Sequence, residues 1–204
     1  MSVVLTGSSV DLGGDVVAMN GMFSLRHKVF SERLGWDVKS DDGMERDYFD
    51  GLDPTYVLVK DEKDVVEGCW RVLPTTGPYM LKDVFPMLLR GEEVPCDPTI
   101  WEISRFAVMP AGSEEGVQAG IHPATIEILR QGYKFAIENG IKRYVAVTSV
   151  AMERFLVRMV GVPMTRLGDK KSQHVGKTLS VACWIDVDER LYKALFENNA
   201  PYNS

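Results

Sequence analysis

Residues 100–108, Ile100-Trp-Glu-Ile-Ser-Arg-Phe-Ala-Val108, form the stretch that decides the fold. Their β-branched and aromatic content, between Pro98 and Pro110, predicts one strand. Side chains alternate along a strand, so one face should carry Glu102, Ser104 and Phe106, and the other Trp101, Ile103, Arg105 and Ala107. Burying a charge is costly unless it is paired. The Glu and the Arg therefore indicate an internal ion pair, a half-exposed edge strand or a functional site.

Length and composition describe an ordinary globular protein. The 204 residues predict a single domain, 1–204, with a substantial core. A net charge of −6 argues against a nucleic-acid partner. The three cysteines and three histidines lack metal-binding or disulfide spacing, so we expect no metal. We find neither a signal peptide nor a run long enough to span a membrane, and we expect a cytoplasmic protein without a membrane partner.

Periodicity around the central strand predicts an α/β fold. A helix is expected from His122 to Asn139 and a strand from Tyr144 to Ser149, which makes a βαβ unit with parallel strands. Upstream, strands 56–60 and 65–73 should form a hairpin. Further helices are expected at 14–33, 151–160 and 188–197, a short helix at 80–89 that Pro86 would limit, a strand at 179–187, and a long ordered loop at 31–54. Together these elements predict a mixed sheet with helices on both faces.

Four motifs occur in order along the chain. They are Arg26-x3-Phe30-x5-Trp36, then Glu45-x-Asp47-x2-Asp50, then Gly68-Cys-Trp-Arg71, then Trp101-Glu102-x-Ser104-Arg105-Phe106. In this order and spacing the chain resembles the acyl-homoserine-lactone (autoinducer) synthase family from about residue 22 to 160. The resemblance implies an N-acetyltransferase-like mixed sheet splayed to form a cleft.

The resemblance also implies an activity. Family members take an acyl chain from acyl-carrier protein, join it to the amine of S-adenosylmethionine and close the lactone, releasing methylthioadenosine. S-adenosylmethionine is then a substrate, and no cofactor is implied. The implied catalytic residues are Glu102, Asp47 and Arg105, with Glu102 as the general base that accepts the amine's proton.

Residue types agree with the implied substrate, which carries an ammonium, a carboxylate and a sulfonium. Acids can hold the cations, an arginine can grip the carboxylate, and aromatic faces attract a sulfonium. The expected S-adenosylmethionine site comprises Arg26, Phe30, Trp36, Asp47, Asp50, Arg71, Arg105 and Phe106. Two interpretations stay open: Arg71 as an internal strut for Asp47 or Asp50, and Phe30 and Trp36 as core residues only.

The implied acyl pocket comprises Phe85, Ser104, Ala146 and Thr148, although Phe85 could equally be a core residue and Ser104 part of a polar network. Family members that prefer a 3-oxo chain tend to carry Thr where Ala146 stands. Ala146 has no hydrogen-bond donor for the 3-oxo oxygen, whereas the hydroxyl of Thr148, on the same strand face, could supply one. We therefore expect an unsubstituted acyl chain.

The segment 142–177 has eight basic and two acidic side chains, a local charge of +6. It is either a solvated face or a dock for acidic acyl-carrier protein, with Arg154 and Arg158 as the docking residues.

Two other functions remain open. One is an N-acyltransferase that uses acyl-coenzyme A on another amine; Glu114 and Glu115, in the loop 110–120, would repel the phosphates of coenzyme A. The other is a non-enzymatic module that binds S-adenosylmethionine.

Overall fold

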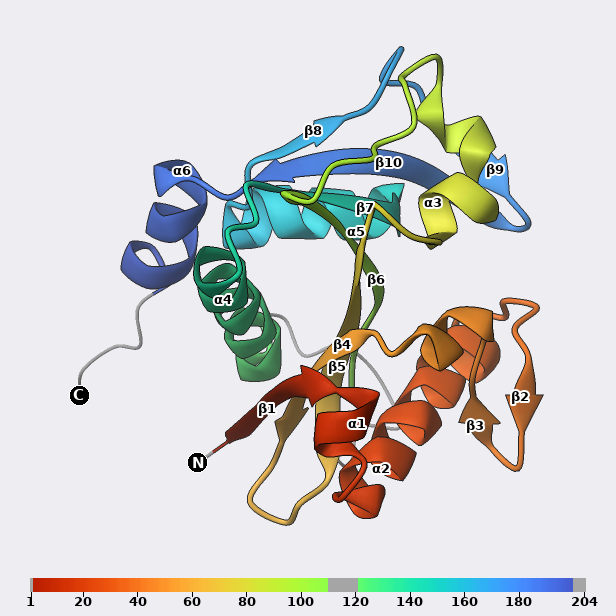
Figure 1. Ribbon diagram of the computed structural model, residues 1–204, viewed down its shortest axis with the longest axis vertical. Coiled ribbons are helices and arrows are strands. Elements are labelled where there is room, and N and C mark those ends of the chain that lie inside the picture. Colours follow the sequence, from red (N-terminus) through yellow and green to blue (C-terminus); the bar gives the residue numbers. More distant parts are fainter. Residues whose placement is uncertain (1, 110–120, 200–204) are drawn as a thin grey trace. The chain divides into compact units, whose positions relative to one another are not determined.

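The computed structural model describes residues 2–109 and 121–199, and the chain divides into two compact units (Figure 1). Unit 1 is Met1–Val72 with Arg105–Gln131, and unit 2 is Leu73–Ser104 with Gly132–Ser204. Strands β5 and β6 and helix α4 thus contribute residues to both units. The single domain expected from length stays a prediction. Glu114 and Glu115 lie outside the described residues.

Unit 1 holds the N-terminal elements and an antiparallel sheet. Its elements are β1 (Val3–Ser8), α1 (Ser9–Leu12), α2 (Val16–Arg26), the π-helix η1 (His27–Arg33), β2 (Ser40–Asp41), β3 (Met44–Glu45), the 3-10 helix η2 (Tyr48–Leu52), β4 (Thr55–Lys60), most of β5 (Val66–Pro74), the second half of β6 (Ile100–Val108) and the first half of α4 (Pro123–Glu138). Strand β4 pairs with both β1 and β5 in antiparallel register. The hairpin predicted for residues 56–73 is confirmed.

Helices cover both faces of the unit 1 sheet. Tyr56 lies opposite Arg71 and Leu58 opposite Cys69, so these side chains share one face. On that face Tyr56, Leu58 and Cys69 pack in a buried cluster with apolar residues of α2. On the other face, a Cβ atom at Gly68 would lie 2.6 Å from Cδ1 of Ile128 in α4. A side chain at position 68 would therefore require the Ile128 side chain to move.

Unit 2 contains the rest of the sheet and the C-terminal helices. Its further elements are α3 (Met80–Asp83), the 3-10 helix η3 (Pro86–Leu89), β7 (Arg143–Ser149), α5 (Val150–Phe155), the π-helix η4 (Leu156–Val160), β8 (Met164–Arg166), β9 (Gln173–Val175), β10 (Thr178–Asp186), α6 (Glu189–Tyr192) and the π-helix η5 (Lys193–Glu197). Strands β6 and β7 are parallel, and β10 is antiparallel to β7, β8 and β9. The βαβ unit and the mixed sheet are therefore confirmed.

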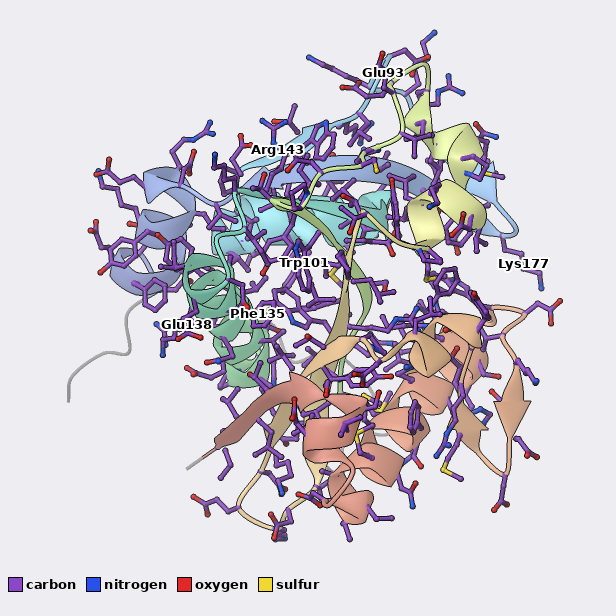
Figure 2. All side chains as sticks on the ribbon, viewed as in Figure 1. Glu93, Trp101, Phe135, Glu138, Arg143 and Lys177 are labelled. Carbon is purple, nitrogen blue, oxygen red and sulfur yellow. The ribbon has the colours of Figure 1, made fainter. Side chains whose placement is uncertain are left out.

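The faces of β6 and β7 in unit 2 are covered by different helices. The ring of Trp101 meets Phe135 of α4 edge-on at a centroid distance of 5.7 Å (Figure 2). The hydroxyl of Tyr144, the β7 partner of Trp101, donates to the carbonyl of Gly132 in α4. Glu102 follows Trp101, points to the opposite face, and binds the start of α3. The expectation of helices on both faces is thus confirmed within each unit, whereas the splayed cleft stays a prediction.

Three segments differ from the sequence-based expectation. The loop 31–54 contains the hairpin β2–β3, whose Asp42-Gly43 turn has φ of 49° and 69°. An Asp-Gly pair with positive φ at both positions is a strong hairpin signal that the sequence analysis missed. The helix expected at 80–89 is interrupted before Pro86, because proline cannot donate to the preceding turn. Strands β8 and β9 have three residues each, which is too short for a two-residue period to be recognised in the sequence. No helix in the described ranges is long and apolar enough to cross a membrane.

Candidate active site

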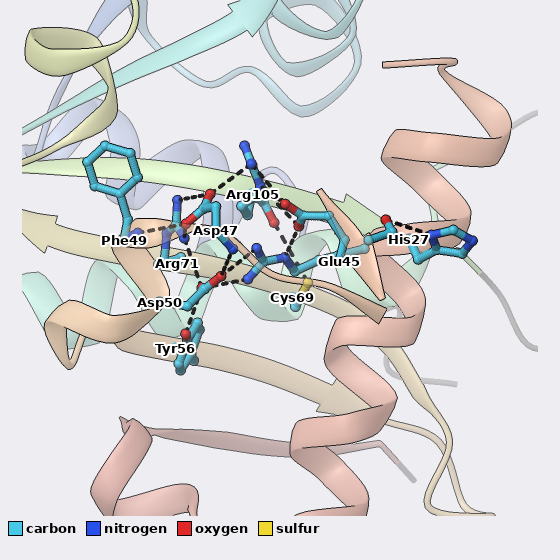
Figure 3. A network of polar contacts seen from close by, with 11 residues as sticks. His27, Glu45, Asp47, Phe49, Asp50, Tyr56, Cys69, Arg71 and Arg105 are labelled. Carbon is cyan, nitrogen blue, oxygen red and sulfur yellow. Dashed lines mark hydrogen bonds and ion pairs between the residues drawn. The ribbon is translucent and has the colours of Figure 1, made fainter. Parts of the chain in front are cut away.

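Six charged side chains of unit 1 form one network of ion pairs (Figure 3). The arginines come from the last residue of α2 and from within β5 and β6, and the acids come from β3, the residue before η2, and η2 itself. They are Arg26, Arg71 and Arg105, with Glu45, Asp47 and Asp50. Three positive and three negative charges balance, which a buried cluster requires.

Arg26 is fully buried and joins two of the acids. Its Nε donates to Oε2 of Glu45 at 2.5 Å, and its two terminal nitrogens donate to the two oxygens of Asp50 at 2.8 and 2.9 Å. Burial alone would lower the pKa of Arg26, but the hydrogen bonds and charges of Asp50 and Glu45 raise it above its ordinary value. Burial likewise acts to raise the pKa of Asp50, and Arg26 and Arg71 hold it well below its usual range. Both groups stay ionised at neutral pH.

Arg71 is also fully buried, and it binds both aspartates. Its Nη1 donates to Asp47 at 2.5 Å and to Asp50 at 2.8 Å, and its Nη2 donates to Asp47 at 3.1 Å. The pairing of Arg71 with the two aspartates, which the strut interpretation expected, is therefore confirmed. Its contact with a substrate stays a prediction.

Arg105 interrupts its strand. Its φ is +55°, in the left-handed region that non-glycine residues rarely adopt. The regular alternation predicted for residues 100–108 is therefore wrong at this position, because a left-handed residue ends the two-residue period locally. The guanidinium donates to Oε1 of Glu45 at 2.9 Å and pairs with Oδ2 of Asp47 at 2.8 Å. It also lies over the ring of Phe30, 5.4 Å from the centroid.

Exposure separates the six side chains into two groups. The side chains of Arg26, Arg71 and Glu45 are completely buried, whereas those of Asp47, Arg105 and Asp50 are 17%, 9% and 8% exposed. Asp47 is thus the most exposed acid of the network and Arg105 its most exposed arginine. All three carboxylates bind arginines, an arrangement that suits an organic ion better than a metal ion.

Aromatic side chains adjoin this network. Phe30 and Trp36 stack with centroids 5.1 Å apart and an interplanar angle of 24°, and Trp36 N–H bonds the Phe30 carbonyl. Phe30 is buried in the core, whereas Trp36 is only partly buried. Phe106 contacts Trp70 instead. Because Trp70 and Arg71 point to opposite faces of β5, Phe106 is not brought together with the charged network.

Two members of the network were not among the predicted site residues. Glu45 lay inside a quoted motif, but its place between Arg26 and Arg105 was not foreseen. Tyr56 donates its hydroxyl to Asp50 at 2.8 Å. Burial and the Asp50 charge raise the pKa of Tyr56, so the phenol stays protonated as a donor. The one available signal for Tyr56 was its position in the hairpin, opposite Arg71.

Glu102 accepts two backbone hydrogen bonds within unit 2. Its Oε2 accepts from Met80 N–H at 2.8 Å and its Oε1 from Leu81 N–H at 2.6 Å, and the residue is 1% exposed. These two amides are the first two of helix α3. The base role of Glu102 stays a prediction.

The residues predicted for the acyl pocket also lie in unit 2. Ala146 is buried, pairs with Ile103 of β6 and lies opposite Cys183 of β10. Thr148 lies opposite Val181, two positions on, and shares the face of Ala146. Ser104 is buried on β6, and Phe85 is half-buried between α3 and η3. Their contact with an acyl chain stays a prediction.

Comparison with known proteins agrees with this geometry. The family model described as autoinducer synthase matches residues 15–195. The chain belongs to this family. It is 43% identical over 175 residues to the acyl-homoserine-lactone synthase of Aliivibrio fischeri, covering 86% of this chain and 89% of that protein. The corresponding enzyme of Pseudomonas aeruginosa is 39% identical over 184 residues, with 89% of each chain covered.

Solved structures extend the comparison to the fold. The acyl-homoserine-lactone synthase LasI has a TM-score of 0.84 at 37% identity, covering 96% of this chain and 95% of that chain. An N-acetyltransferase from Lactobacillus plantarum, at 12% identity and a TM-score of 0.60, shares the fold alone. The N-acetyltransferase-like fold is thus confirmed. The chain is an acyl-homoserine-lactone synthase, a transferase, and the two alternative functions are set aside.

Charges on the synthase's basic segment are partly neutralised. Arg166 makes a bidentate pair with Glu153, and Arg143 pairs with Asp186. Arg154 on α5 and Arg158 on η4 are exposed. Neither forms an ion pair within the described part of the chain, so both are available to an acidic partner.

Proposed function

We propose that the synthase transfers an unsubstituted acyl group from acyl-carrier protein to the amine of S-adenosylmethionine and then closes the lactone. The observation that carries this proposal is the network in unit 1, in which Asp47 and Arg105 are the most exposed acid and arginine, and the other four side chains pair with one another and with them. A zwitterionic amino-acid moiety needs such a pair. A related structure, that of the coenzyme A-dependent synthase BjaI, holds S-adenosylmethionine and isopentyl-coenzyme A, which supports this substrate class.

Asp47 and Arg105 would hold the methionine moiety of the substrate. In this assignment Asp47 accepts hydrogen bonds from the α-ammonium, and Arg105 binds the carboxylate through a two-pronged contact. Trp36, partly buried beside Phe30, offers a ring face to the sulfonium or the adenine. The other predicted members, Arg26, Asp50 and Arg71, act by fixing these groups, since a site must hold its contacts within a fraction of an ångström.

Two bond changes complete the reaction. The α-ammonium first loses a proton to solvent. The neutral amine then attacks the thioester carbonyl, the new C–N bond replaces the C–S bond, and a second proton from the nitrogen leaves with the carrier thiol. The carboxylate oxygen then attacks the γ-carbon, and the carbon–sulfonium bond breaks to release methylthioadenosine. An acyl-enzyme is not needed. Cys69 and Cys183 are buried, and burial raises the pKa of each thiol to about 12, so neither supplies a thiolate at neutral pH.

The acyl donor is proposed from surface charge. Arg154 and Arg158 are exposed and available for pairing, and acyl-carrier protein is acidic. Long-range attraction between such patches raises the rate of encounter. Coenzyme A is the competing donor, because two structural relatives, BjaI and MesI, are coenzyme A-dependent synthases.

One assay tests these proposals together. The synthase is incubated with labelled S-adenosylmethionine and an acyl group of one length, offered on carrier protein or on coenzyme A. We expect equimolar lactone and methylthioadenosine, with the higher kcat/KM for the carrier donor. A higher kcat/KM with coenzyme A would overturn the donor assignment. Absence of lactone with every donor across a panel of chain lengths would overturn the reaction itself.

A further inference from the structure

The carboxylate of Glu102 already has two strong partners. It accepts consecutive backbone N–H groups, those of Met80 at 2.8 Å and Leu81 at 2.6 Å, and the residue is 1% exposed. The first N–H groups of a helix have no partner within the helix, so a side chain must satisfy them when they are buried. Glu102 does so from a strand more than twenty residues further along the chain. A general base, by contrast, must reach the proton it removes.

Other contacts fasten the same segment to the region before Glu102. The amide and the hydroxyl of Thr75 both donate to the carbonyl of Ile100, and the hydroxyl of Tyr79 donates to the carbonyl of Pro95. Tyr79 N–H, just ahead of the helix, donates to Asp83 at 3.0 Å. The start of α3 is therefore fixed by two carboxylates, one buried and one on the surface.

Helix α3 in turn fixes Phe85. The amide of Phe85 donates to the carbonyl of Met80, the first residue of α3. Met80 and Leu81 are buried, and so are Leu88 and Leu89 of the following helix η3. A displacement at the start of α3 would thus be passed to Phe85, one of the residues predicted to contact the acyl chain.

We infer that Glu102 is a positioning residue for acyl recognition, acting through helix α3, and is not the base that accepts the amine's proton. This inference rests on the proposed function, because Phe85 matters only if an acyl chain binds beside it. Its consequence is a division of labour: loss of Glu102 should weaken use of the acyl donor more than it slows the chemical step.

The test compares three proteins, wild type, Glu102→Gln and Asp83→Ala. Glutamine has the shape of glutamate but one acceptor oxygen, so its amide would face one of the two N–H groups. We expect the KM for the acyl donor to rise about 2- to 30-fold, which is the factor that corresponds to the free energy lost with a helix cap. We expect kcat to change by less than the KM does. The KM for S-adenosylmethionine should stay unchanged.

Asp83→Ala is the matched control, because Asp83 is exposed and holds the start of the same helix, but it is not a candidate base. The inference expects a smaller rise in acyl-donor KM in Asp83→Ala, and restoration by Asp83→Asn, which keeps an acceptor oxygen. It is overturned if folded Glu102→Gln loses about 10²–10⁴ in kcat with unchanged acyl-donor KM, as removal of a general base would require. An unchanged acyl-donor KM in Asp83→Ala would overturn it as well. Failure of the wild type to form lactone would instead overturn the proposed function, so the two failures are distinguishable.

Discussion

At the residue scale, the buried network of unit 1 has more influence on stability than the surface ion pairs. Arg71 has no exposed side-chain surface and satisfies two aspartates, whereas Arg190 binds Asp186 and Asp188 in solvent. Removing one partner of a buried pair leaves an uncompensated charge, but an exposed pair is screened by water. The network is therefore a structural part of the enzyme as well as a candidate binding site.

We predict that Arg71→Met lowers the free energy of unfolding by about 3–5 kcal/mol, because Asp47 and Asp50 each lose a buried partner. Denaturant titration followed by circular dichroism measures this change. Arg190→Met is the control and should leave the midpoint unchanged. Equal effects of the two variants would show that the network is no more stabilising than a surface pair.

A second residue-scale prediction concerns Ala146 and the acyl chain. The wild type should prefer a plain acyl donor over its 3-oxo counterpart of equal length, because Ala146 supplies no hydrogen-bond donor. Ala146→Thr should move the ratio of kcat/KM toward the 3-oxo donor by about 5- to 150-fold, which corresponds to about 1–3 kcal/mol.

Ala146→Val is the matched control, since valine has the shape of threonine without the hydroxyl. A similar shift in both variants would attribute the effect to volume. A wild-type preference for the 3-oxo donor would indicate that Thr148, on the same strand face, already supplies the donor.

At the element scale, unit 2 contains a close contact between two loops far apart in sequence. Nε and Nη2 of Arg90 donate to the two carboxylate oxygens of Asp169, and Glu92 accepts a hydrogen bond from the amide of Gly168 at 2.8 Å. Gly168 has φ of +53°, and a Cβ atom there would lie 2.3 Å from the carbonyl oxygen of Arg90. The segment between β8 and β9 thus packs directly on the backbone that follows η3.

This contact predicts different costs at two glycines with similar backbone conformation. Gly176 has φ of +56° and no atom near its virtual Cβ, so Gly176→Ala should cost only about 1–2 kcal/mol from the left-handed conformation. Gly168→Ala has the same conformational cost and must also displace the Leu89–Arg90 backbone. We expect a lower melting temperature for Gly168→Ala than for Gly176→Ala. Equal melting temperatures would mean that the segment between β8 and β9 can move away from the Leu89–Arg90 backbone without loss of stability.

At the scale of the whole molecule, charge is unevenly distributed. The chain carries −6, yet residues 142–177 carry +6. The ion pair of Arg143 with Asp186, which lies outside the segment, offsets part of that local excess. Arg154 and Arg158 keep their charge exposed, so they are the specific residues through which the segment could attract an acidic carrier.

We predict that Arg154→Gln with Arg158→Gln raises the KM for acyl-carrier substrates and flattens its dependence on salt, without changing the KM for S-adenosylmethionine. Screening at high ionic strength should remove the difference from wild type. The control replaces two exposed lysines of unit 1, Lys28 and Lys63, with glutamine, which gives the same net charge. If both double variants respond alike, net charge and not a docking patch is responsible.

The sequence by itself determined the elements whose information is local. The hairpin of β4 and β5, helix α4 and the βαβ unit follow from periodicity and turn residues, and the ordered motifs indicated the family. It also indicated that Asp47, Asp50 and Arg71 belong together. The Asp42-Gly43 turn could have been identified by the same reasoning.

Only the tertiary structure decided which polar groups meet. Arg26 and Glu45 are 19 residues apart in sequence, and Arg105 and Glu45 are 60 apart. Periodicity states which face a side chain occupies, but not which partner it finds there. The left-handed backbone conformation of Arg105 changes the face of β6 on which the following side chains lie. Phe106 consequently lies beside Trp70. Glu102 caps α3 because the fold leaves two buried amides without helical partners, and no sequence pattern near Glu102 contains that information.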